Sequence, residues 1–259
     1  MIIDIHTHCY PDFLASKAIS KIDGTNLKAA YDGTYRGLIE DNKRVGIDKA
    51  VVLCIANRSS HQRSVNEFAV QANSNEELIA FGSVHPFADD YKYYVDMLSD
   101  NGIKGIKFQP FYQDFDVNDK QALKVYEYIA SKEMVLFFHS GVDLLVKGEY
   151  CSPEKIREVI DCLRYPKMAI AHMGCWGYGE KMFELVVGQD VYLDTSFSYR
   201  YETEGVRKRF IESHSADKIL FGTDRPWTDA ETDIKLIKEL GDELSKKILG
   251  ENAKKLLGL

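Results

Sequence analysis

The stretch MVLFFHS (residues 134–140) is an almost continuous apolar run that ends in a histidine and a serine. A strand that is apolar on both faces is typical of a parallel sheet covered by helices on each side. Seven further short runs share this character, which predicts a fold of repeated parallel strands. These runs are IIDIH (2–6), KAVVLCI (49–55), LIAFGSV (78–84), IKGIKFQ (103–109), MAIAHMG (168–174), VYLDTS (191–196) and KILFGTD (218–224).

Polar segments of helical length separate the runs, as in SPEKIREVIDCLRY (152–165), where Ser152 is a candidate N-cap and Pro153 a first helical residue. Eight strand and helix units in 259 residues predict one (β/α)8 TIM barrel domain over residues 1–259. A doubly wound open sheet is the alternative. Residues 10–48 exceed a simple crossover and predict either a lid or extra helices, and residues 231–259 predict helices that complete the outer layer.

The composition excludes several classes of protein. A net charge of -7, from 33 basic and 40 acidic residues, argues against a scaffold that binds nucleic acid through its phosphates. No apolar run approaches the roughly 20 residues that span a bilayer, and the first residues lack the features of a signal peptide. Five cysteines without a C-x-x-C pair indicate reduced thiols. We therefore expect a cytoplasmic protein without a membrane or nucleic-acid partner.

Histidines and a carboxylate occur where the predicted strands end. Asp4, His6 and His8 alternate along the first run, so their side chains share one face of a strand. His139 ends the fifth run and Asp224 the eighth, and the carboxyl ends of parallel barrel strands meet at one rim. This mixed nitrogen and oxygen set predicts a divalent metal site with His6, His8, His139 and Asp224 as ligands. Zn²⁺ is the expected ion, and Mn²⁺, Fe²⁺, Co²⁺ and Ni²⁺ are alternatives.

Two other side chains are predicted close to this site. His172, at the end of the sixth run, is expected to contact substrate or metal-bound water, and His172 and Asp224 are the predicted catalytic residues that transfer protons. Asp4 is expected one layer deeper, where it orients a ligand imidazole or pairs with Lys107. A purely structural interior aspartate is the alternative for Asp4.

The order of these motifs resembles the amidohydrolase superfamily, and within it the amidohydrolase-related branch that includes aminocarboxymuconate-semialdehyde decarboxylase. The resemblance covers essentially the whole chain. It implies a distorted TIM barrel, one divalent ion rather than two, and chemistry by metal-activated water or by a metal-held substrate. It rests on Asp4-x-His6-x-His8, FFHSG with His139, AHMG with His172, LDTS, ILFGTDRPW with Asp224, and the closing ILGENAKKLLGL.

Lys107 lies on the fourth run, where the binuclear members of that superfamily carry a carbon dioxide-modified lysine that bridges two metals. Three roles for Lys107 stay open: that bridge, an inward lysine neutralised by a carboxylate such as Asp4, or a substrate anchor. Arg58 is the preferred clamp for a substrate carboxylate, because a guanidinium matches a carboxylate in bidentate fashion. The other predicted substrate-binding residues are Gln109, Tyr112, Trp176 and Arg225.

Three functions are compatible with these residues. The preferred one is hydrolysis of a small amide, lactone or ester by metal-activated water. The second is metal-dependent decarboxylation of a small unsaturated or aromatic carboxylic acid, and the third is binding of a metal or ligand without turnover. We expect a small-molecule substrate, and a homo-oligomer is left open.

Overall fold

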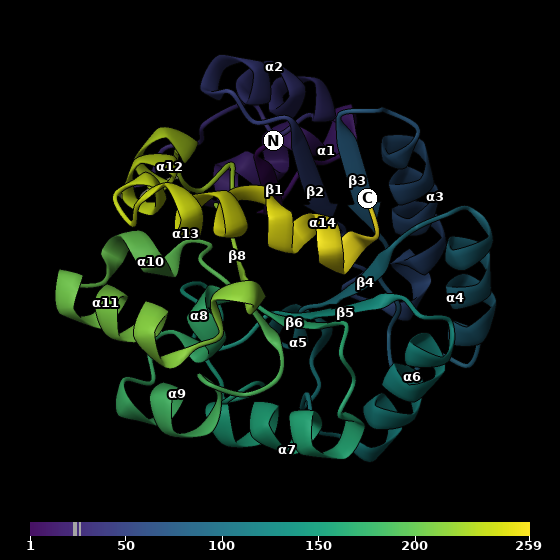
Figure 1. Cartoon of the computed structure of the whole chain (residues 1–259). Coiled ribbons are helices and arrows are strands. Elements are labelled where there is room, and N and C mark those ends of the chain that lie inside the picture. Colours follow the sequence, from purple (N-terminus) through teal and green to yellow (C-terminus); the bar gives the residue numbers. More distant parts are fainter. Residues whose placement is uncertain (23–24, 26) are drawn as a thin grey trace.

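The computed structural model describes residues 1–22, 25 and 27–259, and in this part of the chain eight parallel strands are surrounded by helices (Figure 1). Each strand coincides with one of the apolar runs, and β1 extends one residue beyond its run; side chains on both faces of these strands are buried. The strands are β1 (Ile3–Thr7), β2 (Lys49–Leu53), β3 (Leu78–Phe81), β4 (Gly105–Phe108), β5 (Val135–Phe138), β6 (Met168–Ile170), β7 (Tyr192–Asp194) and β8 (Ile219–Leu220).

The strands form a closed barrel. They pair in sequence order within two groups, β1 to β3 and β4 to β8. Parallel bridges join the groups at Gly82 with Ile106 and at Thr7 with Arg225. The backbone N–H of Ile5 also donates to the carbonyl of Phe221 at 2.9 Å. The predicted (β/α)8 fold is therefore confirmed, and the doubly wound open sheet is wrong.

Helices form the outer layer of the barrel in Figure 1. α7 begins at Pro153 as predicted, and Ser152 takes the N-cap position without a side-chain capping bond. The α-helices are α1 (Asp12–Ile19), α2 (Tyr35–Val45), α3 (Gln62–Asn73), α4 (Tyr91–Asp100), α5 (Pro110–Gln113), α6 (Lys120–Ser131), α7 (Pro153–Leu163), α8 (His172–Cys175), α9 (Glu180–Leu185), α10 (Ser198–Tyr201), α11 (Glu204–Ser213), α12 (Ala230–Lys238), α13 (Asp242–Lys246) and α14 (Asn252–Leu257). Short 3₁₀ helices, η1 (Ser20–Ile22), η2 (Ser59–His61) and η3 (Ala216–Lys218), and a π-helix, η4 (Lys247–Glu251), accompany them.

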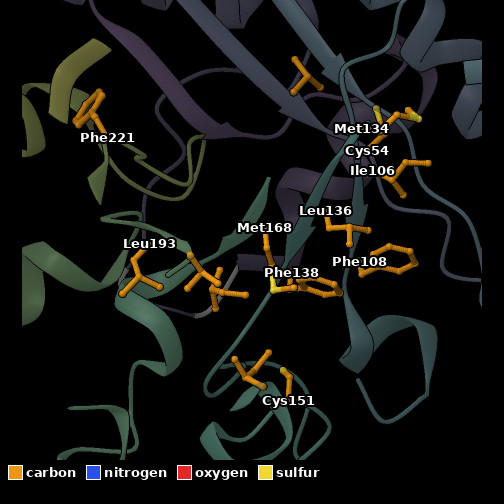
Figure 2. Packing of buried hydrophobic residues seen from close by; sticks show 14 of the residues in the cluster. Cys54, Ile106, Phe108, Met134, Leu136, Phe138, Cys151, Met168, Leu193 and Phe221 are labelled. Atoms are coloured by element: carbon orange, nitrogen blue, oxygen red, sulfur yellow. The ribbon is translucent and has the colours of Figure 1, made fainter. Parts of the chain in front are cut away.

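Side chains alternate between two apolar layers. On β5, Leu136 and Phe138 belong to the layer between strands and helices, whereas Val135 and Phe137 belong to the barrel interior. Figure 2 shows Leu136 and Phe138 near Phe108 of β4, and the rings of Phe108 and Phe138 stack with centres 5.6 Å apart. The alternation follows from the two-residue period of a strand. Both faces of each strand are thereby buried.

The C-terminal helix occupies a place that the sequence did not predict. α14 crosses one end of the barrel instead of completing the outer layer (Figure 1). Its Ala253, Leu256 and Leu257 pack into the same interior cluster as Ile3 and Ile5 of β1. The apolar face of α14 therefore covers the interior at the end where the strands begin, which leaves the carboxyl ends of the strands for the cavity described below.

Residues 10–48, predicted as a lid or extra helices, contain α1, η1 and α2. Residues 23, 24 and 26 of this segment lie outside the described part of the chain. Among the helices of the described residues, none combines the length and apolarity needed to cross a membrane.

A buried histidine in the outer layer makes stability depend on pH. His214 accepts a hydrogen bond at Nδ1 from the backbone N–H of Gly188 and donates from Nε2 to the carbonyl of Val191, both at 3.0 Å. Burial lowers its pKa from 6.5 to about 4. The stability that the neutral ring contributes is therefore fully present above pH 6.5 and is lost as the pH falls toward 4.

We expect protonation of His214 to contribute to the pH dependence of the free energy of unfolding. Between pH 6.5 and 4 this residue should lower the free energy of unfolding by up to about 3 kcal/mol. The free energy of unfolding, measured by urea denaturation at several pH values, should fall less steeply with decreasing pH in His214→Gln than in the wild type. His61→Gln, at an exposed position, is the matched control. Equal slopes for the wild type and His214→Gln would contradict the assignment.

Candidate active site

His6 of β1, His8 directly after β1 and one carboxylate after β8 converge at the carboxyl end of the barrel. The Nε2 atom of His8 lies 3.0 Å from Oδ1 of Asp224, and Nε2 of His6 lies 3.3 Å from the same oxygen. The alternate positions of His6 and His8 on one strand face bring both rings to this side. Burial would raise the pKa of Asp224, but the adjacent His6 and His8 hold it at about 2. Asp224 is therefore a carboxylate available to a cation.

The other two predicted histidines lie next to this group. Nε2 of His172 is 3.1 Å from Nδ1 of His139. One ligand atom each from His6, His172 and Asp224 falls within 4.8 Å of the other two, so His172 is a candidate ligand in this geometry. Nε2 of His139 is buried and has no hydrogen-bond partner in the described part of the chain. Both imidazoles are thus close enough to serve the site, and their division between ligand and catalyst stays a prediction.

Asp194 at the end of β7 contacts the ring of His6 and the backbone of His172, and its role was not predicted. Its Oδ2 atom lies 2.7 Å from Nδ1 of His6, and its Oδ1 accepts the backbone N–H of His172 at 2.8 Å. The hydroxyl of Ser196 lies 2.9 Å from Nδ1 of His6 and 3.0 Å from Nδ1 of His172. When Nδ1 of His6 donates to Asp194, Nε2 keeps its lone pair for a cation. Asp194 could have been assigned to the site from the sequence, because it lies at the end of a predicted strand, as Asp224 does.

Replacing Asp194 should weaken the binding of a divalent ion. An Asp194→Asn side chain loses the charge that orients His6, so we expect a 10- to 100-fold lower ion affinity with the fold retained. Competition with a metal indicator dye would measure this change. Asp190→Asn, at an exposed site just before β7, is the control. An unchanged affinity in Asp194→Asn would contradict the positioning role.

The backbone at this end of the barrel is closely packed and partly strained. A Cβ atom on Gly222 would lie only 3.0 Å from Cβ of His6, so glycine allows the chain after β8 to approach β1. His172 and Asp224 have positive φ angles of 57° and 68°, which residues other than glycine rarely adopt. The backbone N–H of Asp224 donates to the carbonyl of His6 at 2.8 Å. Such strain is typical of functional sites.

The histidines open into a cavity of about 370 Å³. Four predicted substrate-binding residues line it, namely Lys107, Gln109, Tyr112 and Trp176. The segment predicted as a lid contributes Lys21, Thr25 and Leu27. Most of the remaining wall is apolar or aromatic and comes from Tyr10, Ile55, Val142, Leu144, Leu145, Phe197 and Trp227, and Asp143 adds a carboxylate. The size suits a small molecule.

The structure does not place the two predicted arginines at the cavity. Arg58 is exposed beside η2 and is not part of the lining. Arg225 is fully buried, with Nη2 donating to Asp4 at 2.9 Å and Nη1 donating to Asp41 at 2.7 Å. Nη2 also donates to Asn42 at 2.7 Å. Arg225 therefore joins β1 to α2 instead of binding substrate, because its donors already have partners.

Asp4 follows the structural alternative. Its carboxylate accepts hydrogen bonds from the Thr223 hydroxyl at 2.6 Å and from Arg225. It contacts the backbone N–H of His6 at 3.2 Å but no imidazole ring and no lysine among the described residues. The predicted roles of orienting a ligand ring or pairing with Lys107 are wrong, because the carboxylate of Asp4 is paired with Arg225 instead.

Lys107 is the most unusual charged group in the cavity. Its side chain is 1% exposed, and its Nζ atom has no hydrogen-bond partner among the residues that the structure describes. Burial lowers its pKa from 10.5 to about 8, although Asp194 and Asp224 act in the opposite direction. Nζ lies 4.7 Å from the centre of the Phe137 ring. Of the three roles considered for Lys107, pairing with Asp4 is excluded by this geometry.

A closed parallel barrel with imidazoles and carboxylates at the carboxyl ends of its strands defines an α/β-barrel protein with a candidate metal centre. Residues 3–259 match the model of the amidohydrolase family, and the chain belongs to this family. The resemblance found in the sequence is thus confirmed. A search of curated proteins finds no significant match.

Solved structures with the same fold are distant in sequence. An uncharacterized TIM-barrel protein of Bordetella bronchiseptica is 19% identical, with a TM-score of 0.78 over 99% of this chain and 98% of that chain. A 5-carboxyvanillate decarboxylase of Novosphingobium aromaticivorans with bound manganese is 14% identical, with a TM-score of 0.74 over 100% and 97%. A probable 2-pyrone-4,6-dicarboxylic acid hydrolase of Acinetobacter baumannii with bound citric acid is 18% identical, with a TM-score of 0.68 over 100% and 99%. These likenesses support the barrel fold.

Proposed function

We propose that the protein is a metal-dependent decarboxylase of a small planar carboxylic acid. The observation that carries the proposal is the convergence of His6, His8 and Asp224 at the base of a cavity with mostly apolar and aromatic walls. Flat aromatic walls suit a planar substrate. The manganese-bound barrel of similar fold is named as a decarboxylase of an aromatic acid, which supports the same class of reaction here.

The residues present fit one divalent ion. His6, His8 and Asp224 would supply two imidazole nitrogens and a carboxylate oxygen. Nε2 of His139, which has no hydrogen-bond partner among the described residues, is a candidate fourth ligand, and so is His172, which groups with His6 and Asp224. Such a set suits Zn²⁺ and is also compatible with Mn²⁺. When bound, the ion supplies positive charge that holds the substrate oxygens and stabilises charge in the transition state.

The protein's own groups would manage the proton. In the overall reaction the C–C bond to the carboxylate breaks, its electron pair stays on the ring or alkene carbon, carbon dioxide leaves, and that carbon takes a proton. We assign proton transfer to His172 and Asp224, and the carbonyl of Ser196, 3.0 Å from Nδ1 of His172, orients the ring. The reaction consumes no water, which agrees with the apolar walls.

Hydrolysis of a small lactone, ester or amide is the second candidate. It was the preferred function from the sequence, and Asp224 has the position that a base for water would need, within 3.3 Å of the imidazoles of His6 and His8. The barrel of similar fold named as a probable pyrone dicarboxylic acid hydrolase favours this alternative. The mostly apolar and aromatic walls suit a reaction that consumes no water, which makes decarboxylation the stronger proposal.

One screen separates the two reactions. Protein loaded with Zn²⁺ or Mn²⁺ is incubated with a panel of carboxyl-¹³C aromatic and unsaturated acids, and in parallel with lactones, esters and amides in H₂¹⁸O. Release of ¹³CO₂ supports decarboxylation. Entry of ¹⁸O into the product supports hydrolysis and contradicts the first proposal. Activity in neither arm contradicts both and favours binding without turnover.

A further inference from the structure

We propose that Lys107 and Gln109 form a binding site for a carboxylate of the ligand, so that the cavity selects anions over neutral analogues. This inference rests on the proposed function in one respect, namely that the bound carboxylate belongs to a substrate. Lys107 carries the proposal because its ammonium group is buried, lines the cavity and has no hydrogen-bond partner in the described residues. A buried cation without a partner is costly unless a ligand neutralises it.

Among the residues that the structure describes, none donates to or accepts from Nζ of Lys107, and the two nearest carboxylates already have other partners. Phe137, its direct neighbour on β5, offers only an aromatic ring to Nζ. The ring of His6 packs against the same phenylalanine with centres 5.4 Å apart, which places Lys107 beside the candidate ion site. Asp194 is already bonded to His6 and His172, and Asp224 contacts His6 and His8.

The sum of the charges around the cavity also favours an anionic ligand. Asp194, Asp224 and Asp143 contribute three negative charges, whereas a divalent ion, Lys107 and Lys21 together would contribute four positive charges; Asp143 and Lys21 line the same cavity. Asp4 belongs to a separate buried group, in which Arg225 pairs with it. A ligand with one negative charge would neutralise the cavity, whereas a neutral ligand would leave one positive charge buried.

Gln109 lies two residues beyond Lys107, on the same side of the chain, and also lines the cavity. Its Oε1 atom is buried without a hydrogen-bond partner among the described residues. The backbone N–H of Gln109 is held by Oε1 of Gln113 at 2.9 Å, which fixes the start of the side chain. Rotation of the amide presents its NH₂ group instead, as a second donor beside the ammonium. A carboxylate offers two oxygens to these two donors.

The test uses benzoate and its uncharged counterpart benzamide as probes of the full chain loaded with Zn²⁺. Isothermal titration calorimetry compares the wild type with Lys107→Met, which keeps the length of the side chain and removes the charge. Lys104→Met is the matched control, because Lys104 is exposed just before β4. We expect benzoate to bind the wild type more tightly than benzamide, and Lys107→Met to bind benzoate about 10- to 100-fold more weakly, with benzamide affinity and zinc content unchanged.

Several results would overturn the proposal. They are equal affinities of the wild type for the two probes, an unchanged benzoate affinity in Lys107→Met, or parallel losses for both probes. A ¹³C carbamate signal after incubation with ¹³C-bicarbonate that Lys107→Met lacks would also overturn it, because a modified Lys107 carries no positive charge. If Lys107→Met does not fold by circular dichroism, Lys107→Gln takes its place in the same titration.

The fate of this proposal is separable from that of the proposed function. Benzoate affinity that depends on Lys107 without release of ¹³CO₂ from any acid would contradict decarboxylation and leave the carboxylate site standing. Release of ¹³CO₂ with a benzoate affinity that does not depend on Lys107 would support decarboxylation and contradict the carboxylate site.

Discussion

The His6→Ala variant should lose the bound divalent ion. His6 contributes Nε2 to the candidate site, 3.3 Å from Oδ1 of Asp224, and its ring is the group that Asp194 orients. Removing the ring deletes one ligand and leaves the buried Asp194 carboxylate without its imidazole partner. We expect the wild type to carry about one ion per chain after purification without chelator. His6→Ala should retain less than about a tenth of this amount, as measured by inductively coupled plasma mass spectrometry.

The same measurement assigns the remaining imidazoles. His61→Ala, at an exposed position on η2, is the control and should keep its ion. The sequence predicts that His139→Ala loses the ion and His172→Ala keeps it, whereas the grouping of His172 with His6 and Asp224 predicts loss in His172→Ala. An ion content in His6→Ala equal to that of the wild type would contradict the proposed metal site.

The Asp224→Asn variant should lose turnover while it keeps its fold. Asparagine has the same size but cannot accept or transfer a proton, and it is also a weaker ligand for a cation. Loss of a general acid or base costs about 10²- to 10⁴-fold in rate. With the added loss of charge at the ion we expect a fall in kcat of at least about 10³-fold. Asparagine tolerates the left-handed backbone conformation at this position, where φ is 68°, so the thermal midpoint should change little.

Turnover of the first substrate found in the ¹³CO₂ and ¹⁸O screen is the readout for this variant. Asp89→Asn, on the exposed connection after β3, is the matched control and should behave as the wild type. Ion content is measured on the same samples, so that loss of the ion is separated from loss of proton transfer. Full activity in Asp224→Asn would exclude Asp224 from the reaction.

Local patterns in the sequence determined the barrel fold and which side chains lie at the carboxyl ends of its strands. Apolar runs such as 134–140 predict buried strands because burial of both faces is a property of the strand itself. The two-residue period placed His6 and His8 on one face, and the strand ends at His139, His172 and Asp224 brought distant residues to one side once the strands were parallel. These inferences need only the short-range geometry of the backbone and a consistent strand direction.

Partnerships between charged side chains were decided only by the tertiary structure. Arg225 follows Asp224 directly, yet it turns into the protein because Asp4, Asp41 and Asn42 from distant parts of the chain occupy its donors. Lys107 faces the cavity without a hydrogen-bond partner among the described residues, and those same contacts occupy Asp4, the partner considered for it. The covering of one barrel end by α14 likewise depends on an interior surface that exists only after the strands have closed. A buried charge is stable only with its partner, and which partner it finds depends on the whole fold rather than on its neighbours in sequence.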